Sequence, residues 1–471
     1  MAIEQSVANL VIDNITDRCT SLKNELVRFG EKEYPSLGPY RLIKFLQSAN
    51  DEIVKQVNII VQDKDTLSLL TEEQIEIRLY RYAKLIPYLH VLLSFIKGAE
   101  IKDVPAGLIN PLKRLISKFL PDTEIIFLSS TIFNYSFFDL ATQIRIVFGK
   151  SFKDLLASFP EHLMVISLPE SEKKNTLLHC IIAHEIGHGI AQRSGKADEL
   201  RKLVYDNIDK LEFETTIKSL FQILHDKQGG DQPSLFPTEL QVKEMITSGV
   251  NGTIANWIEE LAADGLGVCI LGPAFYFSFI HFITSCHYIN DVSLTHPPPK
   301  VRIFFMSHFI RDNDLGFEKL FEQYPRMKEF FIVWSKLTES PSSSQDPVFK
   351  LVMKAIYKIQ AALKEMVINI IGDNSLTFEK LSNLPTLVEL LINIIPPNEI
   401  IDYERQEIIS SDISSILNAG WATYISEFEE FSINVKRNLK EIERFGLKER
   451  LNEILSKAIE LTEIRTITEA G

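Results

Sequence analysis

The sequence predicts a mostly helical α+β protein. Long stretches at both ends carry apolar residues at helical spacing among charged ones. Strand-like runs of β-branched and apolar residues are confined to the middle, at Glu124–Leu128 and Met164–Leu168, with Ile144–Phe148 as a weaker third. Two strongly apolar segments, Asn175–Ser194 and Ile254–Val268, follow the strands and favour buried helices. We therefore expect a small sheet beside helices, flanked by helical regions.

The length of 471 residues exceeds what one ordinary core accommodates. We expect three regions: a helical N-terminal region 1–121, a core 122–311 and a helical C-terminal region 312–471. Within the core, the Gly- and Pro-containing segment His225–Glu239 indicates an exposed loop. The Ser/Pro-rich segment Glu339–Pro347 is the best linker candidate, and amphipathic helices such as Val348–Ile371 and Ile433–Ile464 follow it.

Composition excludes some classes of function. Hydrophobic residues make up 45% and charged residues 24% of the chain, which is typical of a globular protein. The formal net charge is −13, and the sequence shows no concentrated cluster of Lys and Arg. Because nucleic-acid binders neutralise phosphates with such clusters, we expect no nucleic-acid partner.

The cysteines and the N-terminus indicate a reducing compartment. The four cysteines are far apart and form no CxxC pair: Cys19, Cys180, Cys269 and Cys286. The first residues, MAIEQSVANLVIDN, lack the basic start and apolar stretch of a secretory signal. We therefore expect a cytoplasmic protein.

One segment is long and apolar enough to cross a membrane. Ile270–Ile289 reads ILGPAFYFSFIHFITSCHYI. It contains a proline, two histidines and several hydroxyl side chains, which are costly in lipid. We expect it to form a buried core helix rather than a transmembrane span.

The strongest chemical signal is the segment HEIGH. His184 and His188 are four positions apart, so on a helix both imidazoles face one side and can bind one metal ion. Glu185 is adjacent and can act as general base on a metal-bound water. Two helix histidines with purely structural roles are the competing interpretation.

A catalytic zinc needs a third protein ligand, and NWIEELAADGLGV offers one downstream. Glu260 and Asp264 are again four positions apart. We expect Glu260 to bind the metal and Asp264 to accept a hydrogen bond from the other ring nitrogen of His184. Glu259 is a competing ligand, but Ala263 stands where its second acid would be. Acids at this spacing more often lie on a solvated helix face.

A third motif, THPPPKVRI, places His296 and Arg302 six positions apart. We expect the three prolines to hold the backbone extended and to display the imidazole at a fixed place. A cation and an imidazole near a zinc can stabilise a developing oxyanion. Alone, the motif would more often be a loop with an incidental histidine.

Together, HEIGH, E-x-x-A-D and HPP with an arginine six positions after the histidine resemble the CAAX-type prenyl protease and HtpX family of gluzincin zinc peptidases. The resemblance covers roughly residues 122–311 and implies a zincin-like core, with a soluble stand-alone member as the expected form. It implies one zinc ion bound by His184, His188 and Glu260, with Glu185 as base and Asp264 behind the ligands. It also implies His296 and Arg302 beside the substrate carbonyl. Met164–Leu168 would bind a peptide by strand addition.

The expected function is therefore that of a zinc metalloendopeptidase acting on a peptide or protein substrate. Within the same enzyme class, an ImmA/IrrE-like regulatory peptidase is an alternative, although such proteins usually lack the HPP–Arg element. From another class, the chain could be a zinc-binding regulatory or scaffold protein with little turnover, whose helical flanks bind partners. An intact Glu185 favours the peptidase.

Overall fold

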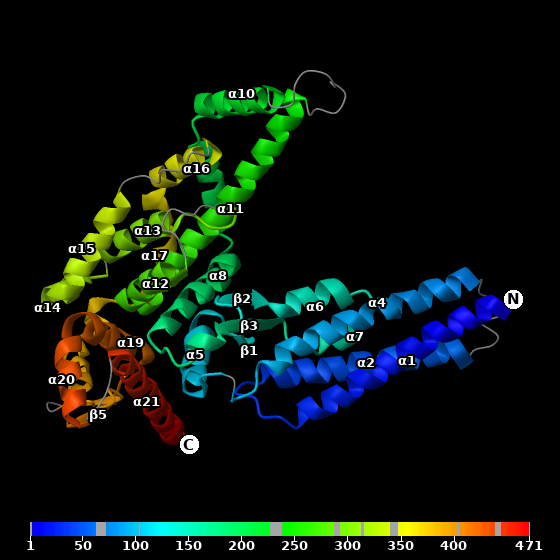
Figure 1. Cartoon of the computed structure of the whole chain (residues 1–471), viewed down its shortest axis with the longest axis horizontal. Coiled ribbons are helices and arrows are strands. Elements are labelled where there is room, and N and C mark those ends of the chain that lie inside the picture. The colour runs from blue at the N-terminus through cyan, green and yellow to red at the C-terminus, as the bar shows by residue number, and fades with distance from the viewer. Residues whose placement is uncertain are drawn as a thin grey trace. The chain divides into compact units, whose positions relative to one another are not determined.

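The computed structural model describes residues 2–62, 72–102, 104–226, 238–286, 293–311, 315–339, 347–402, 406–438 and 444–470. Most of these residues are helical, and the strands form two small sheets (Figure 1), so the expected mostly helical α+β class is confirmed. The chain forms two compact units, Met1–Lys173 and Lys174–Gly471. Their boundary falls inside the region 122–311, so the expected strands and the HEIGH helix belong to different units.

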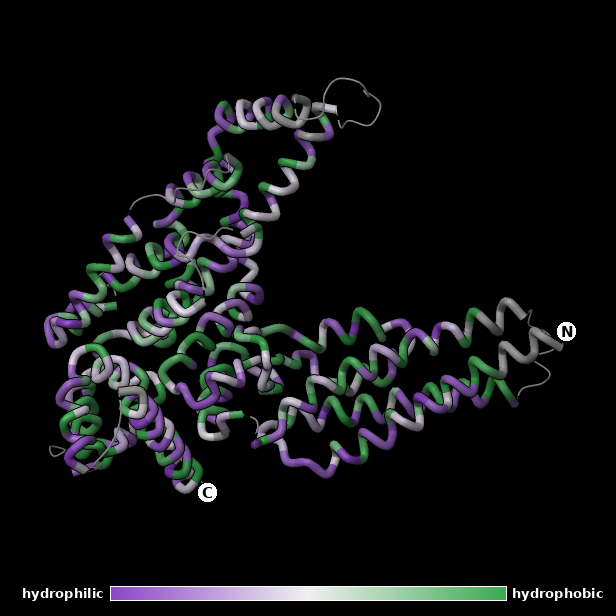
Figure 2. The backbone as a smooth tube through the Cα atoms, in the orientation of Figure 1, coloured by the Kyte–Doolittle hydropathy of each residue, from purple (hydrophilic) through white to green (hydrophobic). Residues whose placement is uncertain are grey.

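The first unit begins with long helices that lie alongside one another (Figure 1): α1 (Ala2–Gly30), α2 (Gly38–Gln62) and α4 (Glu72–Lys97). Apolar and hydrophilic residues alternate along them (Figure 2). In α2 the buried positions Leu42, Leu46, Ala49, Ile53 and Val57 recur every three or four residues and form one face. Burial of that stripe, rather than helix propensity alone, stabilises the group.

The rest of this unit surrounds a three-stranded sheet. Its elements are α5 (Ala106–Phe119), β1 (Thr123–Ser130), β2 (Ser136–Asp139), α6 (Leu140–Phe148), α7 (Lys153–Ala157) and β3 (His162–Pro169). The strand order is β1-β3-β2, with β1 parallel and β2 antiparallel to β3. The two expected strands at Glu124–Leu128 and Met164–Leu168 are therefore confirmed as parts of β1 and β3.

The weaker third strand, Ile144–Phe148, is wrong, because these residues end helix α6. The Asp139 side chain caps this helix by accepting hydrogen bonds from the backbone N–H groups of Ala141 and Thr142. Leu140, Ile144 and Phe148 are buried at a spacing of four residues, which matches a helix and not a strand. The third strand is instead the four-residue β2, which is too short to show a pattern in the sequence.

The expectation that a peptide adds to an edge at Met164–Leu168 is also wrong. Strand β3 is the central strand: Met164 pairs with Ile125 of β1 and with Asp139 of β2, and Ser167 pairs with Leu128 and Ser136. Because Met164–Ser167 have paired neighbours on both sides, these residues offer no free edge to a substrate.

The second unit consists mainly of helices. They are α8 (Ile182–Ser194), α9 (Ala197–Asp206), α10 (Lys210–Asp226), α11 (Glu239–Leu271), α12 (Pro273–Cys286), α13 (Pro299–Arg311), α14 (Glu318–Gln323), α15 (Pro325–Glu339), α16 (Pro347–Lys358), α17 (Gln360–Ile371), α18 (Leu384–Ile392), α19 (Ile413–Ala422), α20 (Phe428–Asn438) and α21 (Arg444–Ala470). A hairpin, β4 (Glu399–Asp402) with β5 (Glu407–Ser410), lies between α18 and α19. The C-terminal helices thus belong to the same unit as the HEIGH helix.

Helix α11 is longer than the expected Ile254–Val268. It begins at Glu239, where Thr238 and Gln241 form a capping box with reciprocal side-chain to backbone hydrogen bonds. It runs through the centre of the second unit (Figure 1) and packs against α8, α9, α13 and α17. The expected loop His225–Glu239 and linker Glu339–Pro347 fall for the most part at 227–237 and 340–346, outside the described residues.

The apolar segment Ile270–Ile289 is divided between two helices. Gly272 has a positive φ of 63°, which ends α11 at Leu271 and allows α12 to begin at Pro273. The described part of α12 is buried over most of its length, and residues 287–289 lie outside the described residues. None of the helices that the structure describes combines the length and the apolarity that crossing a membrane requires.

The HEIGH helix begins later than the expected Asn175, at Ile182, after a short 3-10 turn. The chain before it is held by side chains of other helices. The Leu177 N–H donates to the Asn452 side chain at 3.0 Å, and the Leu177 carbonyl accepts from Ser278 Oγ at 2.7 Å and from Trp421 Nε1 at 3.2 Å. These bonds hold Leu177 directly before the 3-10 turn.

Asn418 links α19 to the junction between α11 and α12. Its side chain accepts a hydrogen bond from the Ala274 N–H at 3.0 Å and donates to the carbonyls of Leu271 at 2.9 Å and Ser414 at 2.8 Å. We expect Asn418→Ala to lower the free energy of unfolding by about 3 kcal/mol, because buried backbone groups lose their partners. Urea denaturation followed by circular dichroism measures this.

The matched control is Asn393→Ala, an exposed asparagine at the end of α18 whose side chain donates to the Glu389 carbonyl. It should change the free energy of unfolding by less than about 1 kcal/mol. Equal effects of the two substitutions would contradict the role assigned to Asn418.

Candidate metal centre

The two helices that carry the sequence motifs approach each other closely at one point. A Cβ atom at Gly187 would lie only 2.7 Å from the Ala263 carbonyl oxygen and 2.9 Å from its Cα. Only glycine at this position of α8 therefore permits this packing against the α11 backbone. Gly187 lies between His184 and His188, and Ala263 lies between Glu260 and Asp264. The contact thus brings the two motifs together.

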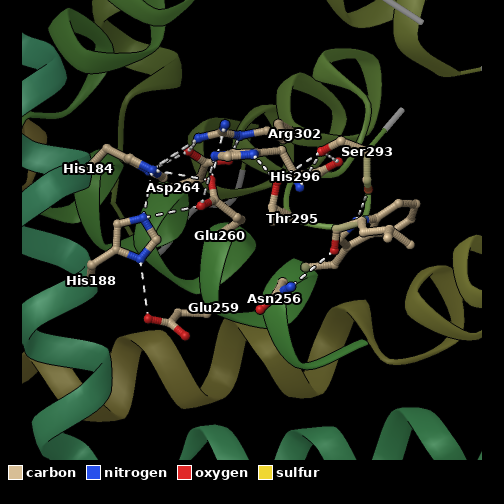
Figure 3. A network of polar contacts seen from close by, with 12 residues as sticks. His184, His188, Asn256, Glu259, Glu260, Asp264, Ser293, Thr295, His296 and Arg302 are labelled. Carbon is tan, nitrogen blue, oxygen red and sulfur yellow. Dashed lines mark hydrogen bonds and ion pairs between the residues drawn. The ribbon is translucent and has the colours of Figure 1, made fainter. Parts of the chain in front are cut away.

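Three side chains from these helices converge (Figure 3). His184 Nε2 lies 3.0 Å from His188 Nε2 and 3.3 Å from Glu260 Oε2, and His188 Nε2 lies 3.4 Å from Glu260 Oε1. In a tetrahedral zinc site with ligand distances of 2.0–2.2 Å, neighbouring ligand atoms are about 3.3–3.6 Å apart. The three groups therefore have nearly the spacing that a single ion requires, and together they could hold one metal ion.

The remaining ring nitrogens of both histidines face carboxylates. His184 Nδ1 lies 2.9 Å from Asp264 Oδ1, and His188 Nδ1 lies 3.6 Å from Glu259 Oε1. A carboxylate behind a ligand imidazole fixes its tautomer and directs Nε2 to the metal. The structure brings Asp264 to its expected place. Glu259, the competing ligand, lies on the opposite side of His188 from Glu260 (Figure 3).

The contact between Glu259 and His188 was not predicted from the sequence. Glu259 Oε1 accepts a 2.6 Å hydrogen bond from Gln192 Nε2, and its Oε2 lies 3.8 Å from Arg201 NH2. These partners come from α8 and α9 and orient the carboxylate. The adjacent acids Glu259–Glu260 were the available signal, since neighbouring residues on a helix diverge by about 100° and can contact opposite sides of one imidazole.

Arg302 is buried behind the ligands. Its guanidinium makes two 2.7 Å hydrogen bonds to the two oxygens of Asp264, and its NH1 lies 3.2 Å from Glu260 Oε2. A two-point pair of this kind fixes orientation as well as charge. The ring of Phe279 lies below the guanidinium, with its centroid 4.5 Å from Cζ.

His296 lies at the outer side of the cluster. Its side chain is 58% exposed, and its Nε2 is 3.4 Å from Glu260 Oε1. The loop that carries it is tied to α11: Trp257 Nε1 donates to the Ser293 carbonyl at 3.0 Å and Asn256 Nδ2 donates to the Leu294 carbonyl at 3.1 Å. These two residues of α11, one turn before Glu260, were not singled out from the sequence.

The expected extended run of three prolines is partly wrong, because Pro299 begins helix α13. Proline suits the first position of a helix, where its missing N–H has no partner to lose. Arg302 therefore stands in the first turn of a buried helix. This placement, and not an extended chain, sets the distance between His296 and Arg302.

Glu185 differs from the other acids of the cluster in its contacts. It is half-buried, and it forms no hydrogen bond or ion pair with the residues that the structure describes, although its charge acts on His188 and Arg302. The neighbouring acids Glu260 and Asp264 are both engaged by Arg302. An acid beside two histidines that could bind a metal ion, and without a hydrogen bond or ion pair to a described residue, could take part in proton transfer.

The charges in the cluster stabilise one another. Burial acts to raise the pKa of Glu260 and of Asp264, but Arg302 and the neighbouring histidines together outweigh it and hold both pKa values below their usual range. Burial acts to lower the pKa of His188, yet hydrogen bonds to Glu259 and Glu260 raise it to about 10. Burial and Arg302 lower the pKa of His184 and Asp264 raises it, with a net increase. The carboxylates are therefore ionised at neutral pH.

The donor set fits a zinc ion. Two imidazoles and one carboxylate are ligands that zinc accepts, and three protein ligands leave a fourth position for a reactant. Glu260 Oε2 is shielded from solvent, and its neighbours are Arg302 NH1 at 3.2 Å and His184 Nε2 at 3.3 Å, neither in hydrogen-bonding geometry. A metal ion bound at this oxygen would add a direct bond to a buried carboxylate that is otherwise held by ion pairs alone.

Comparison of the chain with protein-family models, curated proteins and solved structures finds no match. The geometry of the cluster and the chemistry of its side chains are therefore the basis on which a function can be proposed.

We expect Gly187→Ala to weaken zinc binding by about 10- to 100-fold, because the added methyl group forces α8 and α11 apart and spreads the ligands. Competition with a chromophoric chelator measures the affinity. The matched control is Gly252→Ala, which places a methyl group on α11 where nothing lies within 4 Å. Undiminished affinity in Gly187→Ala would contradict the importance of the close approach.

The affinity for zinc should increase with pH. In the metal-free protein both imidazoles have raised pKa values, and that of His188, about 10, keeps this imidazole protonated at pH 7. A metal must displace this proton. We therefore expect affinity to rise from pH 6 to pH 9, with proton release. Calorimetry in buffers of different ionisation enthalpy measures it, and a pH-independent affinity would contradict the protonated state.

Proposed function

We propose that this chain is a zinc-dependent endopeptidase with a gluzincin-type site, similar to the CAAX-type prenyl protease and HtpX family. One observation carries the proposal: an HExxH helix and a second helix present two imidazoles and a carboxylate at the mutual distances of a tetrahedral site. The orienting carboxylates behind both histidines support it, because purely structural histidines would not need this arrangement.

A zinc ion held by His184, His188 and Glu260 would supply a Lewis acid that polarises a peptide carbonyl and lowers the pKa of water. Glu185 would serve as general base and take the proton from the attacking water. It would then donate that proton to the departing amine, so that one carboxylate serves both halves of the hydrolysis. The absence of a hydrogen bond or ion pair between Glu185 and any other described residue supports this role.

His296 and Arg302 receive different roles in this proposal. His296 is exposed beside Glu260, and burial, as the largest cause, lowers its pKa, so a neutral ring can donate one hydrogen bond to a substrate oxygen. Arg302 is buried and occupied by Asp264 and Glu260. Its contacts favour a positioning role, in which it neutralises the buried acids. The expected place of Arg302 beside the substrate carbonyl stays a prediction.

We expect Glu185→Gln to retain zinc but to lower the cleavage rate by about 10²- to 10⁴-fold, because the amide cannot accept the proton from water. Zinc content is measured by atomic emission, and cleavage with casein and a peptide library. The matched control is Glu199→Gln, an exposed acid on the neighbouring helix α9, which should leave both unchanged.

Glu260→Ala should lose zinc as well as cleavage, because it removes one of three ligands. Full zinc content in Glu260→Ala would contradict the ligand assignment. If wild type and Glu185→Gln both bind zinc and neither cleaves any peptide, the result favours a zinc-binding regulatory or scaffold protein. Cleavage restricted to one regulatory protein would favour an ImmA/IrrE-like peptidase.

A further inference from the structure

The loop before α13 carries a closed set of hydrogen bonds around His296 (Figure 3). The His296 N–H donates to Ser293 Oγ at 2.8 Å, Ser293 Oγ lies 3.2 Å from Thr295 Oγ1, and Thr295 Oγ1 lies 2.9 Å from Nδ1 of the His296 ring. The set begins at the backbone of His296 and ends at its own side chain. It therefore couples the orientation of the imidazole to the conformation of the loop.

The direction of each hydrogen bond follows from a count of protons. A backbone N–H can only donate, so Ser293 Oγ accepts from His296. The Ser293 hydroxyl proton then points to Thr295 Oγ1 at 3.2 Å, which is nearer than the His296 carbonyl at 3.4 Å. That carbonyl already accepts from the Ser293 N–H at 3.3 Å. Because Thr295 has a single hydroxyl proton, this proton is left for Nδ1 of His296.

The other ring nitrogen favours the same tautomer. A neutral imidazole whose Nδ1 accepts a hydrogen bond carries its proton on Nε2. Nε2 of His296 lies 3.4 Å from Glu260 Oε1, and an ionised carboxylate can only accept hydrogen bonds. The opposite tautomer would place the lone pair of Nε2 against this oxygen. Both ends of the ring thus favour a proton on Nε2, on the side of the candidate metal centre.

The loop is anchored to the helix that carries Glu260. Trp257 Nε1 donates to the Ser293 carbonyl at 3.0 Å, and Asn256 Nδ2 donates to the Leu294 carbonyl at 3.1 Å. The Trp257 side chain is fully buried, which fixes the position of its N–H. Since Glu260 follows Trp257 by three positions on α11, one rigid helix sets the places of both the loop and the carboxylate.

We propose that Ser293 and Thr295 are positioning residues, which hold His296 as a hydrogen-bond donor with its Nε2–H directed to the metal-binding side. His296 has this task only in the peptidase proposed above, so the assignment rests on that function. A donor whose orientation and tautomer are set before the reaction stabilises a developing oxyanion better than a ring that rotates or exchanges tautomers. Both hydroxyl groups act through His296 and need no contact with the substrate.

NMR spectroscopy of the full-length protein with isotopically labelled histidine tests the tautomer without peptide cleavage. Spectra at about pH 8, where a histidine of ordinary pKa is neutral, distinguish protonated from unprotonated ring nitrogens. His296→Gln identifies the signals of His296 by their loss. We expect a protonated Nε2 and an unprotonated Nδ1, in the metal-free and in the zinc-loaded protein. A proton on Nδ1 would overturn the proposal.

Thr295→Val removes the hydroxyl group and keeps the β-branched shape, and the exposed position should preserve the fold. We expect the two nitrogen signals of His296 to move toward each other, because the ring then exchanges between both tautomers. Ser293→Ala should shift them in the same direction, and Thr295→Ser should restore the wild-type signals. The matched control is Thr215→Val, an exposed threonine of α10 whose hydroxyl donates to the Leu211 carbonyl, and it should change nothing. Unchanged signals in Thr295→Val would overturn the role of the hydroxyl.

Peptide cleavage shows whether Thr295 acts through His296. Thr295→Val should lower kcat by about 10-fold and leave KM within about twofold, because the donor is misplaced in the reaction and not in substrate binding. In a His296→Gln background the same substitution should have no further effect, since residues that act as a unit are not additive. An equal loss in both backgrounds would overturn the positioning role. If the wild type cleaves no peptide, the proposed function fails, and the NMR spectra still decide whether the hydroxyl groups position His296.

Discussion

The close packing of α8 against α11 is the constraint on which the candidate metal centre depends. With no side chain at Gly187, the Ala263 backbone comes within the distance that a Cβ atom would occupy. This contact lies next to His188 on α8 and within one turn of Glu260 on α11, so it sets the distance between His184, His188 and Glu260. Helices normally pack 8–10 Å apart, and ligand bonds of about 2 Å leave little tolerance. Glycine at position 187 is therefore a condition for this arrangement of the three side chains.

The second requirement is electrostatic. Two acids, two imidazoles and a guanidinium share a buried volume, where isolated charges would be costly. The arrangement alternates signs: Arg302 lies between Asp264 and Glu260, and each histidine lies between carboxylates. This alternation keeps the acids ionised and directs the two Nε2 atoms to one point. A divalent cation bound at that point would displace the protons on the imidazole nitrogens that face Glu260.

The C-terminal helices are part of the support for the centre. Asn452 of α21 and Trp421 of α19 hold Thr176 and Leu177, directly before the HEIGH helix, and Asn418 holds the end of α11. These side chains act on the two helices that carry the ligands. An interpretation of the C-terminal region as a separate partner-binding flank does not account for these buried hydrogen bonds. Its helices extend the same core.

The sequence by itself determined the mostly helical class, two of the strands and the residues of the metal cluster. It could do so because ligand spacing on a helix is local: positions four apart share a face whatever the rest of the chain does. Only the tertiary structure decided that Glu259 lies behind His188, that Arg302 is occupied by acids, and that β3 has no free edge. Each depends on contacts between residues far apart in the chain. The same holds for the segment Ile144–Phe148, whose helical form depends on the Asp139 cap and on burial against the sheet.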